Sequence, residues 1–405
     1  MGSLLVTSTF LPRIGGRELY LNHVFSRFPP KNLAVVTYDR EGDWQAFDQQ
    51  SPFRIFRVDH ADFHWYFRGR RERLKWFVFL GRLCLRERVD VVHCALTVPD
   101  GMSGWLLKKM LGKPYIVYTY AKEIMGPWPT DWHRLNVQRA LQGAERVVTI
   151  SDYTKERLVQ LGVDPSKIVM VYPGVDSEVF HPDPAAGRAV RARHGLLDGQ
   201  PVLMTVARLI PRKGHDKVVE ALPAILRQIP DVVYLIVGTG PEADRLQAHA
   251  QKRGVADRVI FAGCVPDEDL PAYYNAADVF VMPNRKEGTN VEGFGIVFLE
   301  ANACGKPVIG GCSGGAVDAI ADGESGYLVD PYSPPAIAGA AVRLLTDFAL
   351  ARRMGVRGRE WVQKFSWDGA TRQVWALTEE LISTPGCTSG VGQTIRSLRF
   401  LAQRL

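Results

Sequence analysis

Two glutamates, Glu292 and Glu300, stand at either end of the short apolar stretch GFGIVFL. Apolar residues bury well and carboxylates bury badly, so each glutamate needs a partner, and that partner need not be protein. Gly293 and Gly295 permit the backbone to approach a ligand closely, and the helix expected from Ile296 would offer free N–H groups to a phosphate. Glu292 would then reach a sugar from the loop, and Glu300 would accept hydrogen bonds from a ribose diol. The alternative is that both are solvated charges.

A second set of residues suited to an anion follows the apolar run PVLMTVA, where a strand is expected to end at Ala207. Arg208 and Lys213 lie on the loop that comes next. Arginine can hold a diphosphate through two parallel hydrogen bonds, and lysine supplies a compact positive charge. The loop therefore predicts a diphosphate site, with an ordinary exposed basic loop as the alternative.

A pair of glycines, Gly15 and Gly16, separates the first apolar run from the amphipathic stretch RELYLNHVFSRF. Glycines between a strand and a helix bring backbone N–H groups close to an anion or a sugar. The pair lacks the GxGxxG spacing, so a tight strand-to-helix turn without a ligand explains it equally well.

These motifs are carried on apolar runs that alternate with helical patterns, which is typical of a parallel sheet covered on both faces. The alternation pauses over 171–184, where proline and glycine cluster, and then starts again. We therefore expect an α/β protein with two Rossmann-like domains that face a central cleft at the carboxyl ends of their strands. The expected parts are a first domain over 1–182, a second over 183–365, a helix over 366–385 that crosses back to the first domain, and a basic tail over 386–405 whose order the sequence leaves open.

Composition narrows the class of protein and its compartment. The chain has 405 residues, and apolar runs such as Trp76–Leu80 are far shorter than the ~20 residues of a membrane-spanning helix. The six cysteines show no CxxC pair and no metal-ligand spacing, which favours free thiols in a reducing cytoplasm and no metal site. The net charge of +7 favours anionic partners, namely phosphorylated ligands, acidic membrane surfaces or nucleic acid.

The stretch from Glu292 to Glu300 resembles the E-x7-E motif of glycosyltransferase family 4, retaining enzymes with the two-domain GT-B fold. The segments FGIVFLEA, GKPVI and SGG are similar to the family as well, and the similarity extends from the first strand to about Ile382. The segment PRIGG resembles the glycine loop of bacterial mannosyltransferases that act on phosphatidylinositol mannosides.

The resemblance implies that the chain moves a hexose, mannose or glucose, from a nucleotide diphosphate sugar to a lipid, glycan or small-molecule acceptor. The donor would be a GDP-hexose or a UDP-hexose, and no metal or other cofactor is implied. The first domain would hold the acceptor and the second the nucleotide. Closure of the domains would exclude water and so limit hydrolysis of the donor.

The resemblance also implies roles for single residues. Arg208 and Lys213 would neutralise the departing diphosphate, which together with Glu292 and Tyr120 makes the implied catalytic set. Cys264 and Val265 would hold the nucleobase through main-chain groups. The implied donor-binding set is Gly15, Gly16, Arg17, Cys264, Val265, Gly293, Phe294, Gly295, Ile296 and Glu300.

The sequence departs from the family pattern at TYAKE, where many relatives have histidine and then glycine in place of Tyr120 and Ala121. A tyrosine can still donate a hydrogen bond to a sugar hydroxyl, but it does not titrate near neutrality. Glu123 is retained and is assigned with His93 to the acceptor side. A histidine that is simply packed in the core is the alternative for His93.

The segment 65–88 mixes lysine and arginine with aromatic residues. Such segments can lie on an anionic lipid surface, so contact with the inner face of the membrane is one interpretation. Its apolar residues go right round the expected helix, however, which favours core packing with solvated ends. No recognition motif accompanies the charge, so we expect no nucleic-acid partner.

Two other classes of protein are kept as alternatives. Paired Rossmann-like domains also occur in nicotinamide-dependent dehydrogenases, but neither domain supplies a convincing glycine fingerprint with an acidic residue ~20 positions on. A nucleotide-sugar-binding scaffold with impaired catalysis would explain Tyr120 in place of histidine.

Overall fold

The structure is a computed structural model that describes residues 2–12, 15–38, 40, 42–59 and 69–383. The chain divides into two compact units, which we describe separately. Unit 1 runs to Tyr172 and resumes at Trp367, and unit 2 covers Pro173–Ser366. The tail expected over 386–405 lies outside the described residues.

Unit 1 is built on a parallel sheet with seven strands among the described residues. Its apolar runs form strands that are buried on both faces, as continuous runs of valine and isoleucine predict. In spatial order the strands are β3 (Arg54–Arg57), β2 (Leu33–Thr37), β1 (Ser3–Val6), β4 (Val91–Cys94), β5 (Tyr115–Thr119), β6 (Arg146–Thr149) and β7 (Ile168–Met170).

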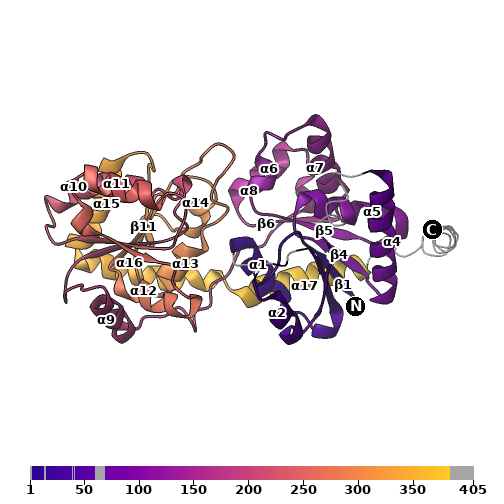
Figure 1. The fold of residues 1–405 in the computed structure, drawn as a ribbon, viewed down its shortest axis with the longest axis horizontal. Coiled ribbons are helices and arrows are strands. Elements are labelled where there is room, and N and C mark those ends of the chain that lie inside the picture. The colour runs from indigo at the N-terminus through magenta and orange to yellow at the C-terminus, as the bar shows by residue number, and fades with distance from the viewer. Residues whose placement is uncertain (1, 13–14, 39, 41, 60–68, 384–405) are drawn as a thin grey trace. The chain divides into compact units, whose positions relative to one another are not determined.

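Helices cover both faces of this sheet, with α1 and α17 on one face and α5 and α7 on the other (Figure 1). The helices of unit 1 are α1 (Gly16–Phe25), α2 (Trp44–Gln50), α4 (Arg70–Arg86), α5 (Met102–Leu111), α6 (Lys122–Met125), α7 (Asp131–Gly143), α8 (Asp152–Gln160) and α17 (Trp367–Ser383). Helix α17 packs on α1, where the Thr371 hydroxyl donates to the Val24 carbonyl at 3.2 Å.

Unit 2 repeats the plan on a parallel sheet with six strands among the residues described. In spatial order they are β10 (Val259–Gly263), β9 (Val233–Val237), β8 (Val202–Val206), β11 (Val279–Met282), β12 (Val308–Gly311) and β13 (Gly326–Val329). The helices are α9 (Pro184–Arg193), α10 (His215–Leu226), α11 (Ala243–Lys252), α12 (Leu270–Ala276), α13 (Ile296–Ala303), α14 (Ala316–Ala319), α15 (Pro334–Thr346) and α16 (Phe348–Trp361). Figure 1 shows α10, α11 and α15 on one face of the sheet and α9, α12 and α13 on the other.

The division between the units falls after Tyr172, earlier than the position after Pro182 that the sequence suggested. The reason is that the intervening segment packs within unit 2. The Val175 N–H donates to the Phe365 carbonyl at 3.0 Å, and the Phe180 ring lies 5.8 Å from the ring of Tyr274.

The strand order places a topological switch point in each unit, because the connections run in opposite directions from β1 and β4 in unit 1 and from β8 and β11 in unit 2. In open α/β sheets, ligands bind in the crevice at the carboxyl ends of the two strands at such a point. Two Rossmann-like parallel-sheet units confirm the expected fold class. The loops that follow β1, β4, β8 and β11 are therefore where a site is to be sought.

The basic, aromatic segment expected over 65–88 falls largely on α4, and its residues 65–68 lie outside the described residues. The Trp76 side chain is 2% exposed, and its indole N–H donates to the Ser103 hydroxyl at 3.1 Å. The middle of α4 is thus part of the core of unit 1. Among the described residues, no helix combines the length and the apolar character needed to cross a bilayer.

Candidate functional site

The strongest cluster of charged side chains in unit 2 joins the loop after β8 to the loop after β11. The Lys213 ammonium lies 2.6 Å from Glu292 Oε2, and the Arg212 guanidinium donates to the same oxygen. The side chains of Lys213 and Glu292 are only 12% and 11% exposed. The cluster therefore sits at the switch point of unit 2, partly shielded from water.

Backbone contacts hold these two loops together. Residues Pro211–Lys213 form a 3-10 turn that ends at Gly214, whose φ of +79° favours glycine. A Cβ at Gly214 would lie 2.2 Å from the Pro283 carbonyl oxygen, so only glycine permits this approach. The Arg285 N–H donates to the Arg212 carbonyl at 2.8 Å, which fixes the cationic turn against the loop after β11.

The charges of this cluster keep Glu292 ionised. Burial alone would raise the pKa of Glu292, but the charges of Lys213 and Arg212 and their hydrogen bonds lower that pKa to about 2. Burial lowers the pKa of Lys213, with Glu292 acting in the opposite direction. A simple ion pair would raise the pKa of Lys213, but here burial outweighs Glu292, and the neighbouring charges of Arg212 and Arg208 act in the same direction as burial. The close contact between the two side chains supports an ionised pair. Two cations on one carboxylate leave the cluster with a net positive charge.

Arg208 adds a further cation at the same edge of the sheet. Its side chain is exposed and makes no ion pair with the residues that the structure describes. Its charge is close enough to lower the pKa of Lys213. An arginine without a carboxylate partner beside a positively charged pair is suited to an anion such as a diphosphate.

The glycine-rich loop after Glu292 leads directly into α13, which begins at Ile296 as the sequence predicted. Gly295 caps the helix with a φ of +93°, and a Cβ there would lie 2.7 Å from the Phe298 ring. The Phe294 side chain is 2% exposed and its ring packs 5.6 Å from that of Phe365. Phe294 can therefore offer a ligand only its backbone, together with Gly293 and the first N–H groups of α13.

Glu300 lies on α13 inside the unit and has a protein partner that the sequence did not reveal. The Tyr274 hydroxyl, from α12, donates to Glu300 Oε2 at 2.5 Å. Burial raises the pKa of Glu300 to about 7, although the hydrogen bond from Tyr274 opposes that shift. Glu300 therefore changes its charge near neutral pH, unlike Glu292.

Cys264 and Val265 follow β10, the strand at the edge of the sheet. Cys264 is exposed and Val265 is half-buried, and both lie outside any helix or strand. Their backbone is thus free of a regular ladder, which suits the main-chain role that the family resemblance implies.

In unit 1, the glycine pair begins α1 and presents a buried ion pair. Gly15 caps the helix in an extended conformation and Gly16 is its first residue. The Arg17 guanidinium lies 2.8 Å from Glu18 Oε1, and the Thr9 hydroxyl also donates to that oxygen. Burial alone would raise the pKa of Glu18, but Arg17 and Thr9 hold it below its usual value. The positive end of the helix and Arg17 therefore lie next to each other after β1.

Asp100 is a buried carboxylate beside this loop that the sequence analysis did not single out. It lies in the turn Thr97–Gly101 after β4, and it is 0% exposed. Neither of its carboxylate oxygens has a hydrogen-bond partner of good geometry among the described residues. Burial raises the pKa of Asp100 to about 7, and the charge of Arg17 opposes this.

Tyr120 and Glu123 follow β5 in the same unit. The Tyr120 hydroxyl is buried and has no hydrogen-bond partner among the residues described, and burial raises its pKa far above the ordinary value. The Glu123 carboxylate accepts the Tyr120 N–H at 2.5 Å, while its pKa is raised by burial. Between them Ala121 adopts a φ of 155°, a conformation that favours glycine. The Tyr120 ring lies 5.7 Å from the ring of Tyr20 on α1, so the loop after β5 lies next to the helix that follows β1.

His93 lies on β4 and is packed in the core. It is 0% exposed, its Nδ1 lies 2.9 Å from the Tyr118 hydroxyl, and the Phe25 ring meets its ring edge-on at 5.0 Å. Burial lowers its pKa to about 3, so the imidazole is neutral. These contacts favour the packed-histidine alternative over the acceptor contact.

The structure brings some of the residues expected from sequence together within each unit, and the roles assigned to them stay predictions. Lys213, Glu292 and Arg208 lie together in unit 2, and Arg17 and Tyr120 lie together in unit 1. Within the described ranges, no group of three or more histidine, cysteine, aspartate or glutamate side chains is placed to hold a metal ion. The residues that sequence reasoning missed are Arg212, Tyr274, Glu18, Thr9 and Asp100.

Comparison with solved structures identifies the fold. The Anabaena protein HepE, solved in complex with UDP, matches with a TM-score of 0.81 at 20% identity and covers 94% of this chain and 100% of its own. Sucrose-phosphate synthase from Thermosynechococcus elongatus matches with a TM-score of 0.77 at 24% identity, over 94% of this chain and 99% of its own. At these identities the likeness shows the fold, which is the GT-B fold of glycosyltransferases.

Sequence comparisons then identify the family. The family described as Glycosyltransferase Family 4 matches residues 14–179, and the family described as Glycosyl transferases group 1 matches residues 188–361. The chain belongs to this glycosyltransferase family, as its E-x7-E motif indicated.

Curated relatives with named activities extend along most of the chain. A GDP-mannose-dependent alpha-(1-6)-phosphatidylinositol monomannoside mannosyltransferase of Mycolicibacterium smegmatis is 35% identical and covers 94% of this chain and 98% of its own length. A GDP-mannose-dependent monoacylated alpha-(1-6)-phosphatidylinositol monomannoside mannosyltransferase of Corynebacterium glutamicum is 30% identical over 90% of this chain and 94% of its own. A D-inositol 3-phosphate glycosyltransferase of Segniliparus rotundus is 31% identical over 87% of this chain and 82% of its own.

Proposed function

We propose that this glycosyltransferase moves mannose from GDP-mannose to a lipid-linked acceptor of the phosphatidylinositol mannoside type, with retention of anomeric configuration and without a metal ion. The choice of donor and acceptor is supported by the mannosyltransferase from M. smegmatis, which resembles the chain over nearly its full length. The single structural observation that carries the proposal is the net positive cluster of Arg212, Lys213 and Glu292 at the switch point of unit 2.

The chemistry needs a positive environment for the departing group. Breaking the bond between the sugar and GDP leaves negative charge on the diphosphate. Arg208 is exposed and has no ion pair within the described part of the chain, and Lys213 is held by Glu292 nearby, so both can stabilise that charge. The free N–H groups at the start of α13 add a third contribution. Side chains and backbone amides would then stabilise the charge on the diphosphate, as a divalent metal does in other transferases.

Glu292 has two tasks in this proposal. Its carboxylate holds Lys213 at 2.6 Å and so prepares the ammonium for the diphosphate. Both cations contact Oε2, so the other carboxylate oxygen can accept a hydrogen bond from the sugar. Glu300, whose pKa is raised by burial, would accept hydrogen bonds from the ribose hydroxyls once it is ionised.

Retention of configuration follows from the family resemblance, which implies attack on the same face of the sugar, assisted by the leaving phosphate. Within unit 2, both carboxylates at the switch point are already engaged, Glu292 by two cations and Glu300 by Tyr274. A carboxylate held in this way is a weak nucleophile, which favours attack by the acceptor itself over a covalent glycosyl-enzyme intermediate.

A lipid acceptor requires the enzyme to reach a membrane surface. Helix α4 buries its apolar middle in unit 1, whereas the side chains of Arg71, Lys75 and Arg82 are exposed. Exposed cations on one helix are attracted to anionic lipid by about 1 kcal/mol per charge. We assign the membrane contact of unit 1 to these residues, and charge reversal of all three should release the protein from anionic vesicles.

A nucleotide-sugar-binding protein without turnover is the second candidate, and Tyr120 is the observation that favours it. Its phenol cannot titrate near neutrality because burial raises its pKa far above the usual value. If the histidine that many relatives have at this position is needed for catalysis, the chain would bind the donor but not transfer the sugar.

A binding measurement followed by a transfer assay separates the two candidates. A thermal-shift panel of GDP, UDP and ADP identifies the nucleotide, and we expect GDP to give the largest shift. Transfer of labelled mannose from GDP-mannose to phosphatidylinositol monomannoside, in the presence of a chelator, then tests turnover and metal dependence, and NMR of the product gives the anomeric configuration. Binding without product would support the second candidate, and activity that a chelator abolishes would contradict metal independence.

A further inference from the structure

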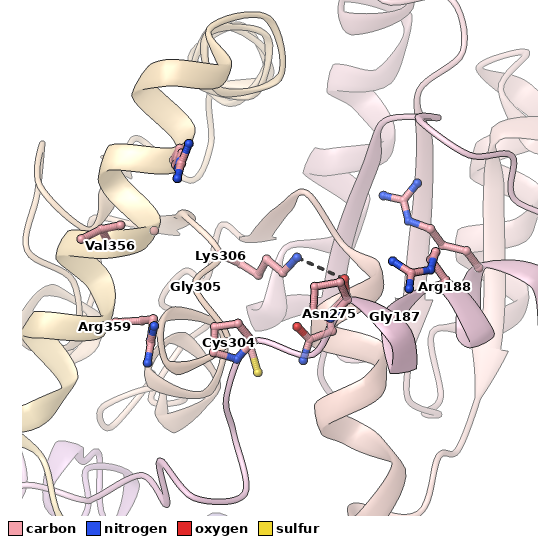
Figure 2. A pocket seen from close by; sticks show the side chains of 13 residues that line it. Gly187, Arg188, Asn275, Cys304, Gly305, Lys306, Val356 and Arg359 are labelled. Atoms are coloured by element: carbon pink, nitrogen blue, oxygen red, sulfur yellow. Dashed lines mark hydrogen bonds between the residues drawn. The ribbon is translucent and has the colours of Figure 1, made fainter.

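Unit 2 contains a hollow of about 690 Å³ that the proposed transfer reaction does not use. Its lining includes five cationic side chains and no carboxylate: Arg188, Arg191, Lys306, Arg352 and Arg359. We call it the basic hollow. Figure 2 shows Arg188 on one wall and Arg359 and Val356 on another, with Lys306 and Cys304 between them.

The basic hollow and the Lys213–Glu292 cluster lie at opposite ends of the strands of the sheet. Lys306 comes just before β12, and Asn275 comes just before β11, so both mark the amino ends of strands. Lys213 and Glu292 come after β8 and β11, at the carboxyl ends. In a parallel sheet all amino ends of the strands lie on one side and all carboxyl ends lie on the other. The hollow is therefore separate from the proposed donor site.

Four of the five cations in the hollow make no ion pair among the described residues. Arg191 is committed, since it lies 2.9 Å from Asp278 and also donates to two backbone carbonyls. Arg188, Lys306, Arg352 and Arg359 make no ion pair with the residues that the structure describes. Lys306 donates only to the neutral Asn275 carbonyl, at 3.1 Å.

Lys306 is a half-buried cation of the hollow, whereas Arg188, Arg352 and Arg359 are exposed. Burial lowers the pKa of Lys306, and the charge of Arg191 lowers it further, while Asp278 acts in the opposite direction. The neighbouring Cys304 thiol stays neutral, because burial raises its pKa to about 12. An anion in the hollow would favour the charged form of Lys306 and accept charge-assisted hydrogen bonds from the exposed arginines around it.

The walls are held in place by close backbone packing. A Cβ at Gly355 would lie 2.1 Å from the Gly305 carbonyl oxygen, so α16 packs directly on the turn that carries Lys306. A Cβ at Gly187 would lie 2.6 Å from the Asn275 carbonyl oxygen, so α9 packs equally closely on α12. Arg188, Lys306 and Arg352 are therefore positioned on fixed elements before any ligand arrives.

We propose that the basic hollow is a second anion site, which binds a phosphate-bearing ligand. Guanidinium groups on two walls and an ammonium between them match the several oxygens of one phosphate or of two linked phosphates. The source of the phosphate is either a free phosphorylated compound or the headgroup of an anionic lipid.

The test uses the full chain and two neighbouring arginines of α16 as a matched pair. Arg352 lines the hollow, whereas Arg353 is exposed and does not. Inorganic pyrophosphate is titrated calorimetrically into the unaltered protein and into Lys213→Ala, which weakens binding at the donor site. R352Q, R188Q and R353Q are then each measured in the Lys213→Ala background. We expect R352Q and R188Q to weaken binding about tenfold each, and R353Q to leave it unchanged. Equal affinity in R352Q and R353Q, or no binding beyond that lost with Lys213→Ala, would overturn the proposal.

A vesicle arm distinguishes the two sources of phosphate. Sedimentation is compared for phosphatidylcholine vesicles and for equimolar phosphatidylcholine and phosphatidylglycerol. Dependence of vesicle binding on Arg352 but not on Arg353 assigns the hollow to a lipid headgroup. If only pyrophosphate binding depends on Arg352, the hollow is assigned to a free phosphorylated compound. Unchanged mannosyl transfer by R352Q in a detergent-solubilised assay would show that its loss of pyrophosphate or vesicle binding does not arise at the donor site.

Discussion

Lys213 and Glu292 come from loops that follow different strands, and their charged atoms meet at 2.6 Å with less than one-eighth of either side chain exposed. The pair joins the loops on the two sides of the switch point, and Arg212 adds a second cation to the same carboxylate oxygen. A buried pair of this kind is weak evidence for a role in stability, because desolvation offsets most of the Coulombic gain. Its position and its excess positive charge favour a role in holding an anion.

The acid stability of the protein should depend on Glu292. Its pKa falls from 4.5 to about 2 on folding, so ionised Glu292 stabilises the fold above pH 4.5, and that stabilisation is lost as the pH falls through about 2. The shift corresponds to at most about 3 kcal/mol. We expect the difference in thermal midpoint between the unaltered protein and Glu292→Gln to shrink across this window. A difference that stays constant from neutral to acid pH would show that the carboxylate is not ionised as described.

Removal of Lys213 should affect turnover far more than folding. Lys213→Ala takes away a charge that acts on the leaving diphosphate, and the expected loss is about 10²–10³ in kcat. Lys217→Ala is the matched control, because Lys217 lies on α10 with its own partner, Glu220, at 2.9 Å. Labelled mannose transfer measures both variants. Similar rates for the two would contradict the assignment of Lys213.

Donor binding should depend on pH through Glu300. Its pKa is raised to about 7, so the free protein holds a proton there at lower pH and becomes less stable as the pH rises from 4.5 through about 7. If the ionised carboxylate accepts from the ribose, donor binding releases that proton, and affinity should rise with pH by up to about tenfold per unit below about 7.

GDP-mannose is the appropriate ligand for this measurement, because its diphosphate is esterified at both ends and does not titrate near neutrality. Calorimetry in two buffers of different ionisation enthalpy counts the proton released. Glu300→Gln should remove both the proton release and the pH dependence. Proton release that persists in this variant would assign the titration to another group.

The sequence was sufficient to predict the fold, because most strands of both sheets are short apolar runs and the motifs begin where such runs end, although the edge strand β3 (RIFR) is not apolar. It also predicted the helix that starts at Ile296, since glycines precede an uninterrupted apolar stretch. The boundary between the units was placed too late, because the Val175 and Phe180 contacts with unit 2 join residues far apart in sequence.

Partners were harder to predict than positions. Nothing near Glu300 in the sequence points to Tyr274, which comes from α12 and reaches the carboxylate only through the fold. Arg212 was passed over because a sequence does not show which of two adjacent cations in a turn faces the carboxylate, and here both do. Asp100 carried no motif at all, and only its complete burial in the fold brings it to notice.

The Tyr120 hydroxyl should matter for transfer and not for folding. Because it is buried without a partner among the described residues, Tyr120→Phe removes an unsatisfied polar group, and stability should be unchanged or slightly higher. If the hydroxyl donates to the sugar, kcat should fall about tenfold with little change in KM for the donor. Tyr20→Phe is a control in the same aromatic cluster, 5.7 Å away between ring centroids. If Tyr120→Phe lowers the stability of the protein as well as kcat, the hydroxyl has a structural role.

Ala121 provides a test of the backbone around Tyr120. Its φ of 155° is costly for any residue with a Cβ, by about 1–3 kcal/mol, and glycine relieves that cost. Ala140→Gly is the matched control, because Ala140 is equally buried in the same unit but lies in the ordinary helix α7. We expect Ala140→Gly to lose about 1 kcal/mol of stability and Ala121→Gly to lose none, as judged by thermal midpoints. Equal losses would show that the Ala121 backbone is not held in this conformation in solution, and the orientation of Tyr120 and Glu123 would then have to be revised.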